Sequence, residues 1–407
     1  MKQFKSMVFS DENDIYMALH SNKSKVSEPE LRTLAFSRGV VYPSKLGRDE
    51  LIDNISDLPF SYSQLQRLTN RLTPKVNRDQ YSVKRIYGKF DFTELPDVIN
   101  KVRAARPRTI GTEHIKHQAS IGQFFIEVEY TEFDFTKGKF QQKRRHAGYI
   151  QFISHDETFT SIRYTFTPRI ESILQEILAE YKLIKDVNID ITNVDLSSVV
   201  SPQLRNEFID KLLTVNKDFI FLGLDKVRVS KVETISDEGS KPKKIGVVDD
   251  IVDSLDQDLM DEDGKLAESD HLSDKDVDKD VDKDHYISDA SFIGKGLSDC
   301  EQVEDLCRSG FYMSRIKWHS KVKFLKDNPV VSFELAFHEK YIGKTLKFRI
   351  LGKTTTDADT GLVVKSPVDG ADFDQVIAKL EELLFSSHDQ VMKNLGDSDD
   401  LVQQEAS

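Results

Sequence analysis

The residues best suited to metal chemistry in this 407-residue chain are two histidines and two cysteines. His114 and His117 form an i, i+3 pair, but no cysteine or third ligand follows at a spacing typical of zinc sites. Cys300 and Cys307 would lie about 10 Å apart on a helix, which is too far for a disulfide or a shared metal. With only two cysteines, the chain also has no disulfide framework. We therefore expect no metal site.

Motifs of the common enzyme classes do not occur in the sequence. There is no Walker loop, no Gly-x-Gly-x-x-Gly and no Gly-x-Ser-x-Gly. A metal-dependent nuclease needs only a few carboxylates and a lysine on a sheet. Asp327, Glu334 and Lys340 could take these roles, but they lack the tight strand spacing of such sites. We expect a protein without catalytic residues or cofactor, and an enzyme of unrecognised type is the third alternative.

Basic side chains offer a different chemistry, the binding of phosphate groups. Arg67 and Arg71 lie one turn apart on a predicted helix and share a face. Loops rich in basic residues and held by a sheet could form a phosphate clamp, although such loops are often simply solvated. Two such clusters follow the helix: Lys101, Arg103, Arg106 and Arg108, and then Lys143, Arg144, Arg145 and His146.

Residues 27–58 predict two short helices joined by an extended connector. The first helix reads ELRTLAFSRG over residues 30–39, and the second begins with GRDELI over residues 47–52. This stretch resembles the SAP-type helix–extension–helix module. That family commonly binds the backbone of DNA or RNA through its second helix and connector.

The resemblance implies that Arg38, Lys45 and Arg48 contact phosphate, because these cations stand at the matching positions. The family's Gly-Lys before Glu-Leu-Ile is Gly-Arg-Asp here, at residues 47–49, which keeps the charge but loosens the match. The alternative is a small helical bundle that only packs or contacts protein.

The net charge of −12 is concentrated in one segment. Residues 236–289 hold 19 acidic and 7 basic side chains, so the rest of the chain is neutral. Residues 75–150 are locally basic, with 15 Lys and Arg against 9 Asp and Glu. A chain that averages acidic can therefore still present a basic face.

The acidic segment also has almost no aromatic residues, and residues 274–284 alternate Asp, Lys and Val. Such a composition cannot bury enough apolar surface to offset the ordering entropy of ~1–2 kcal/mol per residue. We expect residues 236–289 to be an acidic disordered linker. A second role would be to mimic nucleic acid or to shield the basic region within the same chain.

The hydrophobic pattern predicts an α+β fold with a small helical N-terminal head at residues 1–75. Capping boxes at residues 27–30 and 61–64 mark two of its helices. From residue 122 the period changes to two, and an amphipathic helix begins at Pro168, so residues 76–235 form a first lobe. Both this lobe and the next read as an antiparallel β-meander covered by a helix.

The second β-meander and helix lobe covers residues 290–396, and residues 397–407 form a disordered tail. Its strands alternate apolar and polar residues at 331–337 and 346–350, and its helix carries leucines at 380, 383 and 384. The acidic linker separates the two lobes.

These observations favour a non-enzymatic accessory protein that binds nucleic acid through a basic N-terminal surface. The alternative is a protein–protein adaptor subunit of an intracellular complex, such as those of bacterial defence systems or mobile elements. No stretch approaches the ~20 apolar residues that span a bilayer, so we expect a cytoplasmic protein without a membrane partner.

Overall fold

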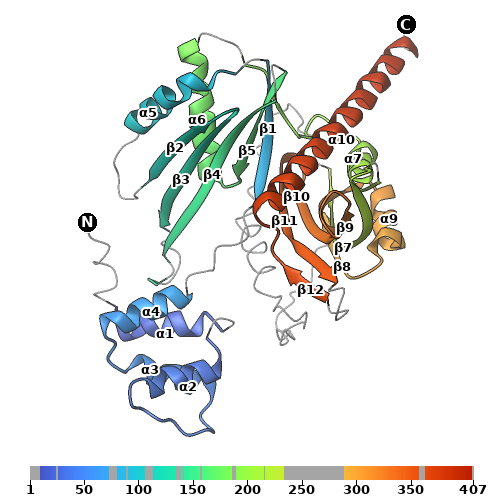
Figure 1. The fold of residues 1–407 in the computed structure, drawn as a ribbon. Coiled ribbons are helices and arrows are strands. Elements are labelled where there is room, and N and C mark those ends of the chain that lie inside the picture. Colours follow the sequence, from blue (N-terminus) through green and yellow to red (C-terminus); the bar gives the residue numbers. More distant parts are fainter. Residues whose placement is uncertain are drawn as a thin grey trace, which may run out of the picture. The chain divides into compact units, whose positions relative to one another are not determined.

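The computed structural model describes the chain from residue 10 to residue 405, with the exception of residues 24–25, 73–79, 89, 106–112, 134–138, 141, 156–157, 186–188, 215, 233–287 and 357–362. The described residues divide into a small helical unit and a large unit built on one sheet (Figure 1). The expected α+β class is confirmed, whereas the expected acidic linker falls almost entirely outside the described residues.

The helical unit contains α1 (Glu12–His20), α2 (Glu28–Phe36), α3 (Arg48–Ser56) and α4 (Tyr62–Leu72). The capping box expected at the start of α2 is present, since the Ser27 amide donates to Glu30 Oε2 at 2.7 Å. Leu19, Leu31 and Leu51 are fully buried in the core between the helices. The periodicity therefore located α2, α3 and α4, and α1 adds a fourth helix to the head.

The large unit contains one antiparallel sheet, whose strands do not follow the order of the chain. Their order across the sheet is β2-β3-β4-β5-β1-β11-β10-β9-β7-β8. In addition, β12 pairs with β11 and β6 pairs with β1. The strands of its first lobe are β1 (Tyr81–Tyr87), β2 (His114–Ser120), β3 (Gln123–Phe133), β4 (Lys143–His155), β5 (Phe159–Thr165) and β6 (Ile191–Asn193). Helices α5 (Leu95–Ala105) and α6 (Pro168–Lys185) cover one face. Ile173 and Ile177 of α6 are fully buried with Phe124 and Ile162 of the sheet.

The strands of the second lobe are β7 (Phe219–Lys231), β8 (Asp289–Ile293), β9 (Phe311–Val322), β10 (Val330–Glu339), β11 (Lys344–Thr356) and β12 (Val363–Ser366). Its helices are α7 (Pro202–Thr214), α9 (Glu301–Arg308) and α10 (Gly370–Glu405), and short 3₁₀ turns occur at Phe92–Glu94 and Leu297–Asp299. Phe333 and Phe348 of the sheet pack with Leu380 and Leu384 of α10 in its core.

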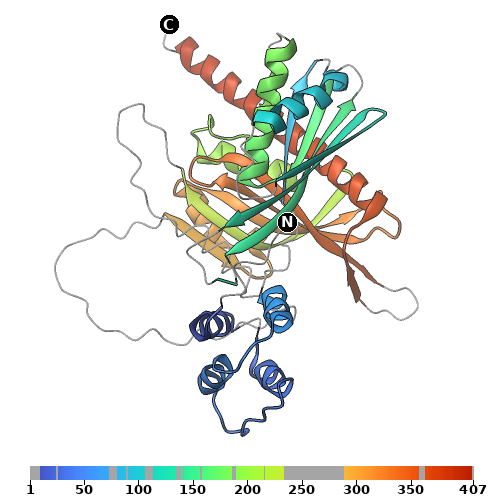
Figure 2. The ribbon, with the colours of Figure 1, turned by 90° about the vertical axis from the view of Figure 1, so that its left-hand side faces the viewer.

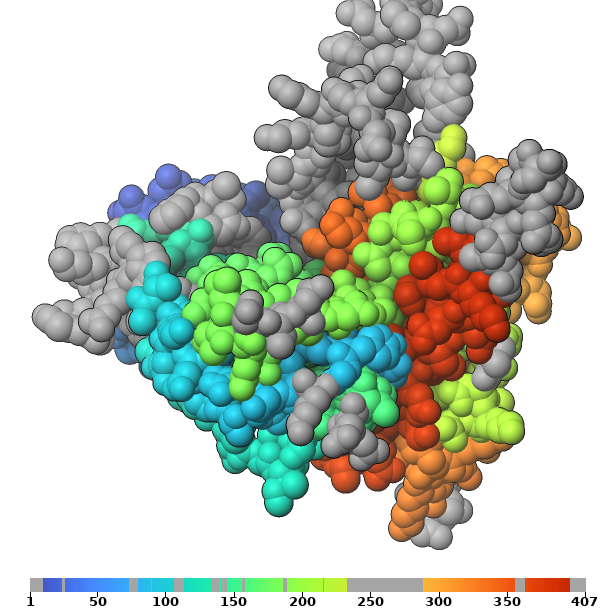
Figure 3. All heavy atoms as spheres, turned by 90° about the horizontal axis from the view of Figure 1, so that it is seen from above, coloured from blue at the N-terminus to red at the C-terminus, as the bar shows by residue number. Residues whose placement is uncertain are grey.

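The lobes share the sheet, because β1 pairs with β5 on one side and with β11 on the other. Helix α10 crosses the strands diagonally (Figures 1 and 2). It reaches β1 of the first lobe, where the Arg85 guanidinium lies 3.9 Å from the ring centre of Phe385. Figure 3 shows the surface of α10 beside that of β1.

Three expected boundaries differ from the structure. Helix α7 and strand β7 precede residue 235 but pack in the second core, where β7 pairs with β9. Asp289 opens β8 and is no part of a linker, and α10 continues to Glu405 through the expected tail. The first two differences arise because β7 pairs with β8 and β9, which lie beyond the acidic segment.

Candidate nucleic-acid interface

The connector between α2 and α3 is shaped by Arg32, which is not among the predicted site residues. The Arg32 guanidinium donates hydrogen bonds to the carbonyls of Pro43 at 2.9 Å, Ser44 at 3.1 Å and Leu46 at 2.9 Å. It also pairs with Glu28 one turn earlier at 2.9 Å. Arg32 therefore fixes the extended path of residues 40–47 against α2.

Two of the predicted phosphate-binding arginines have structural partners in the head. Arg48 donates to the carbonyls of Val26 and Leu19, the latter at 3.2 Å, so its guanidinium ties α3 to the end of α1. Arg71 forms an ion pair with Glu30. Both side chains therefore stabilise the helical unit.

Arg38 is half-buried rather than exposed. Its guanidinium stacks on Phe60, 3.3 Å from the ring centre. All three guanidinium nitrogens are buried, and within the described residues they have no hydrogen-bond partner. Burial accordingly lowers the pKa of Arg38 from its ordinary value.

The remaining predicted cations divide into exposed and undescribed residues. Lys45 in the connector and Arg67 on α4 are exposed, as is Arg145 on β4. The backbone of β4 is described at residues 143–144, but the side chains of Lys143 and Arg144 are not, and Arg106 and Arg108 lie outside the described residues. Residues 10–72 hold nine acidic and eight basic side chains, so the head as a whole is nearly neutral.

A larger group of cations lies on the sheet of the second lobe. The strand register aligns Ser291, Arg228, Arg315, Ala336 and Lys347 in one row across five strands. The next row on the same face holds Ile293, Lys226, Lys317, Glu334 and Arg349. We call these two rows the basic face. Its ten positions hold six cations and one carboxylate.

The opposite face of the same strands is the apolar core, which explains the alternation. Ile316, Leu335 and Phe348 stand in the row between the two basic rows and are almost completely buried. Side chains alternate between the faces of a strand, so the residues of the two basic rows on β7, β9, β10 and β11 point away from this core. Lys226, Lys317 and Lys347 are partly exposed there.

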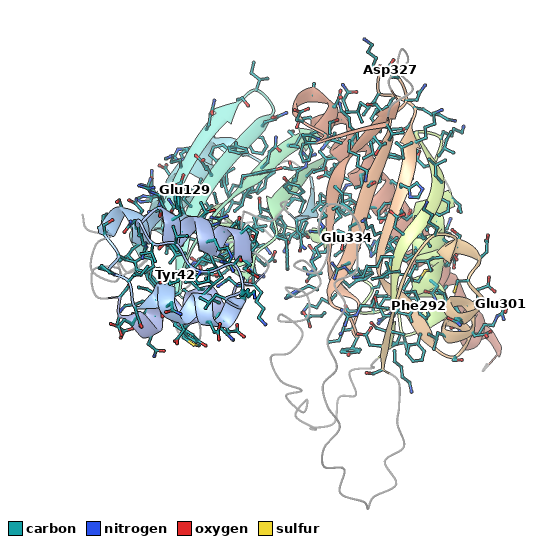
Figure 4. The ribbon with its side chains drawn as sticks, turned by 90° about the horizontal axis from the view of Figure 1, so that it is seen from below. Tyr42, Glu129, Phe292, Glu301, Asp327 and Glu334 are labelled. Atoms are coloured by element: carbon teal, nitrogen blue, oxygen red, sulfur yellow. The ribbon has the colours of Figure 1, made fainter. Side chains whose placement is uncertain are left out.

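Glu334 holds the centre of the basic face in place. Its Oε1 accepts from Arg315 Nε at 2.6 Å, and its Oε2 accepts from Arg349 Nε at 2.6 Å. Burial by itself raises the pKa of Glu334, but the two arginines outweigh it and hold the pKa below its ordinary value. Figure 4 shows Glu334 in the middle of the second-lobe strands.

A second carboxylate stands at the edge of the basic face. Asp289 of β8 accepts from Arg228 Nε at 2.7 Å and from Lys340 Nζ at 3.0 Å, and Ser230 donates to it at 3.2 Å. Burial opposes its ionisation, but the neighbouring cations lower the pKa of Asp289. Lys226, Arg228, Arg315 and Lys347 make further contacts besides those named. With Glu334 and Asp289 both ionised, the six cations of the basic face still outnumber the two carboxylates.

The basic face was not predicted from the sequence, although its signal is present there. Lys347 and Arg349 were seen as the polar half of an alternating strand, but the cations of β7 in the same rows come from the other side of the acidic segment. Only the register shows that the cations of three strands, β7, β9 and β11, stand in the same two rows. A count of cations at alternate positions in each predicted strand would have pointed to it.

The other chemical candidates do not assemble into a site. His114 and His117 lie on the exposed edge strand β2. Asp327 lies in the turn before β10, at the end of the sheet and away from Glu334 (Figure 4). Lys340 is bound to Asp289. Across the described parts of the chain, no three acidic, histidine or cysteine side chains are grouped to hold a metal ion.

A polar cavity of about 370 Å³ adjoins the basic face. It lies between the first turns of α6, strands β1 and β5, and the β10–β11 hairpin. Lys84, Tyr164, Glu171 and His338 line it. Lys347 of the basic face reaches toward it, with its ammonium 6.0 Å from the ring centre of Phe166 in the cavity wall.

Sequence comparison with protein families and with curated proteins finds no relative for the chain. No protein-family model matches it, and no curated protein matches its sequence significantly. The likeness of residues 27–58 to SAP-type modules therefore stays a prediction. None of the described helices is both long enough and apolar enough to cross a membrane.

Proposed function

We propose that this protein is a non-enzymatic accessory protein that binds the phosphate backbone of nucleic acid through the basic face. The observation that carries the proposal is the alignment of six cations in two neighbouring rows with one carboxylate among them. By strand spacing and rise, the three strands that hold these cations, with β10 between two of them, span about 14 Å, and the rows are about 7 Å apart. A strip of this size can contact several phosphates at once.

The face fits backbone binding better than docking of an apolar protein surface. Protein interfaces have cores depleted in charged residues, whereas nucleic-acid interfaces are strongly positive. Arg315 and Arg349 are held by Glu334 from between them, and their side chains are only 10% and 14% exposed, so direct phosphate contacts fall mainly to the partly exposed lysines. The partly exposed lysines beside them add charge without fixed geometry, as sequence-independent binding requires.

The test is a fluorescence-anisotropy titration of the full chain with labelled single-stranded and duplex oligonucleotides at several salt concentrations. We expect dissociation constants of ~10⁻⁴–10⁻⁶ M at physiological salt and a steep loss of affinity as salt rises. Replacing both Lys226 and Lys317 with Gln should weaken binding to every sequence and reduce the salt slope by roughly two units.

The matched control is the double change Lys295→Gln and Lys326→Gln, which removes the same charge from exposed positions outside the two rows. It should leave affinity and salt slope close to those of the unchanged protein. If both double variants lower affinity equally, the attraction is that of overall charge and the basic face is no site. Absence of binding by the unchanged protein at low salt would leave the adaptor function.

A further inference from the structure

A cavity of about 350 Å³ opens on the core side of β7 and β9, away from the basic face. Helices α7 and α9, which lie beside these strands (Figure 1), and the 3₁₀ turn at Leu297–Asp299 form its other walls. Its apolar lining belongs to the second core and consists of Leu213, Phe221, Leu224, Leu297, Val303 and Met313. A concave site of this size with mostly apolar walls is typical of those that bind small molecules.

The charged side chains around this cavity are acidic. Among the described residues that line it, Asp210 of α7 and Glu304 of α9 carry a charge, and none is Lys, Arg or His. Glu304 forms an ion pair with Arg308 at 2.9 Å. Neither a hydrogen bond nor an ion pair connects the Asp210 carboxylate to another described residue. The apolar cavity therefore has a carboxylate at its rim that lacks a counter-ion.

The pKa shifts of this carboxylate and of a neighbouring thiol have the same direction. Asp210 is exposed overall, but shielding of its carboxyl group from water, followed by the charge of Glu207, raises its pKa. Burial, followed by the charge of Asp210, raises the pKa of Cys307 to about 11. A cation placed in the cavity beside Asp210 would oppose both shifts.

We propose that this cavity binds a small organic cation, in which an ammonium group is attached to an apolar alkyl or aryl body. The ammonium group lies against Asp210 at the rim, and the apolar body lies between Leu213, Leu224 and Met313. The carboxylate selects positive charge, and the apolar walls favour a hydrophobic body because its surface is removed from water. This site is separate from the basic face, so the inference goes beyond the proposed function and does not depend on it.

The two cysteines provide a reporter for occupation of this cavity. Cys300 and Cys307 are the only cysteines of the chain, both line the cavity, and both are partly exposed. A ligand in the cavity should therefore shield both thiols from an alkylating reagent. Mass spectrometry of the digested protein measures the modification of each thiol separately.

The experiment uses the full chain and three probes of similar shape: 2-phenylethylammonium, the neutral 2-phenylethanol and the anion 3-phenylpropanoate. Ligand-observed NMR titrations give their dissociation constants. We expect ~10⁻³ M for the ammonium, as for a ligand of few atoms, about 5-fold weaker binding of the alcohol and still weaker binding of the anion. At ten times its dissociation constant, the ammonium should slow alkylation of both thiols by iodoacetamide about 10-fold.

Asp210→Asn removes the charge and keeps the shape, so the ammonium and the alcohol should then bind equally. The change should not lower the thermal midpoint, because the pKa of Asp210 is raised in the folded chain and its charge therefore does not stabilise the fold. The matched control is Glu301→Gln, which removes a charge from an exposed position of α9 that does not line the cavity (Figure 4). This variant should keep the 5-fold preference for the ammonium.

Equal binding of the ammonium and the alcohol by the unchanged protein overturns the inference, and so does the absence of binding. Loss of the preference in both variants overturns it as well, because overall charge would then be the cause. Binding that leaves both alkylation rates unchanged places the cation outside the cavity. None of these outcomes concerns the basic face, whose binding of nucleic acid is tested separately.

Discussion

Arg163 of β5 and Glu381 of α10 form a buried, two-pronged ion pair, with Nε to Oε1 at 2.6 Å and the second nitrogen to Oε2 at 2.9 Å. Their side chains are 4% and 7% exposed. The pair joins the strand of the first lobe to the helix that closes the core of the second. Burial disfavours the charge on Arg163, but Glu381 outweighs it and raises the pKa.

Removing one partner of this pair should destabilise the large unit strongly. We expect Glu381→Ala to lower the free energy of unfolding by about 3–5 kcal/mol, because it leaves the Arg163 charge buried without a counter-ion. The apolar double variant Arg163→Met with Glu381→Leu should lose much less. Denaturant unfolding followed by circular dichroism measures both. A single change that costs no more than the double would show that the pair carries no such energy.

Acid should lower the unfolding free energy of the protein through Glu334, the carboxylate at the centre of the basic face. The pKa of this group is lower in the folded chain than in the unfolded chain, so its contribution is complete above the ordinary carboxylate pKa of about 4.3. The contribution is lost as the pH falls through the lower folded value. The unfolding free energy of the unchanged protein should therefore drop below about pH 4.

The control for this pH dependence is Glu334→Gln, which keeps the shape and cannot ionise. Its deficit in unfolding free energy should be largest at neutral pH and should shrink as the pH falls. Denaturant titrations between neutral pH and acid give the comparison. A deficit that stays constant with pH would contradict the pKa assigned to Glu334.

The acidic segment should affect binding more than folding. Replacing residues 240–284 by a short Gly/Ser linker removes 16 acidic and seven basic side chains. The segment connects β7 to β8, and both strands contribute to the basic face. Losing this negative charge should tighten nucleic-acid binding, most of all at low salt, while the thermal midpoint changes little. A large fall in the midpoint would show that the segment contributes to a core.

The sequence predicted local features of this fold well because local chemistry determines them. The capping box of Ser27 and Glu30 and the buried isoleucines of α6 follow from spacing within one or two turns. Strands β7 and β9 pair residues that lie 80 or more positions apart in the sequence. Hydrophobic periodicity carries no information about pairing at that separation. The assignment of β7 to the first lobe failed for that reason.

The same distinction applies to the candidate site. Arg38, Lys45 and Arg48 were selected by type and position in a motif, but their roles depend on neighbours that the motif does not contain. Arg48 finds two backbone carbonyls and Arg38 finds Phe60, whereas Lys45 stays exposed. Charge can be read from a sequence. Whether a cation faces solvent or the interior depends on the packing around it.

Two sets of substitutions in the helical head should separate the stability of the head from its binding of nucleic acid. Arg48→Gln removes the guanidinium from the carbonyls of Leu19 and Val26, so it should cost the helical unit about 1–3 kcal/mol. Lys45→Gln combined with Arg67→Gln changes exposed side chains and should leave stability within about 0.5 kcal/mol.

If the helix–extension–helix resemblance is functional, the Lys45 and Arg67 double variant should weaken nucleic-acid binding and flatten its salt slope, since both cations can reach phosphate. Thermal unfolding and anisotropy on the same preparations separate the two effects. Unchanged affinity in this double variant, alongside the expected loss of stability in Arg48→Gln, would show that the head only packs. Binding would then belong to the basic face alone, because that face lies on strands whose cations do not depend on the head.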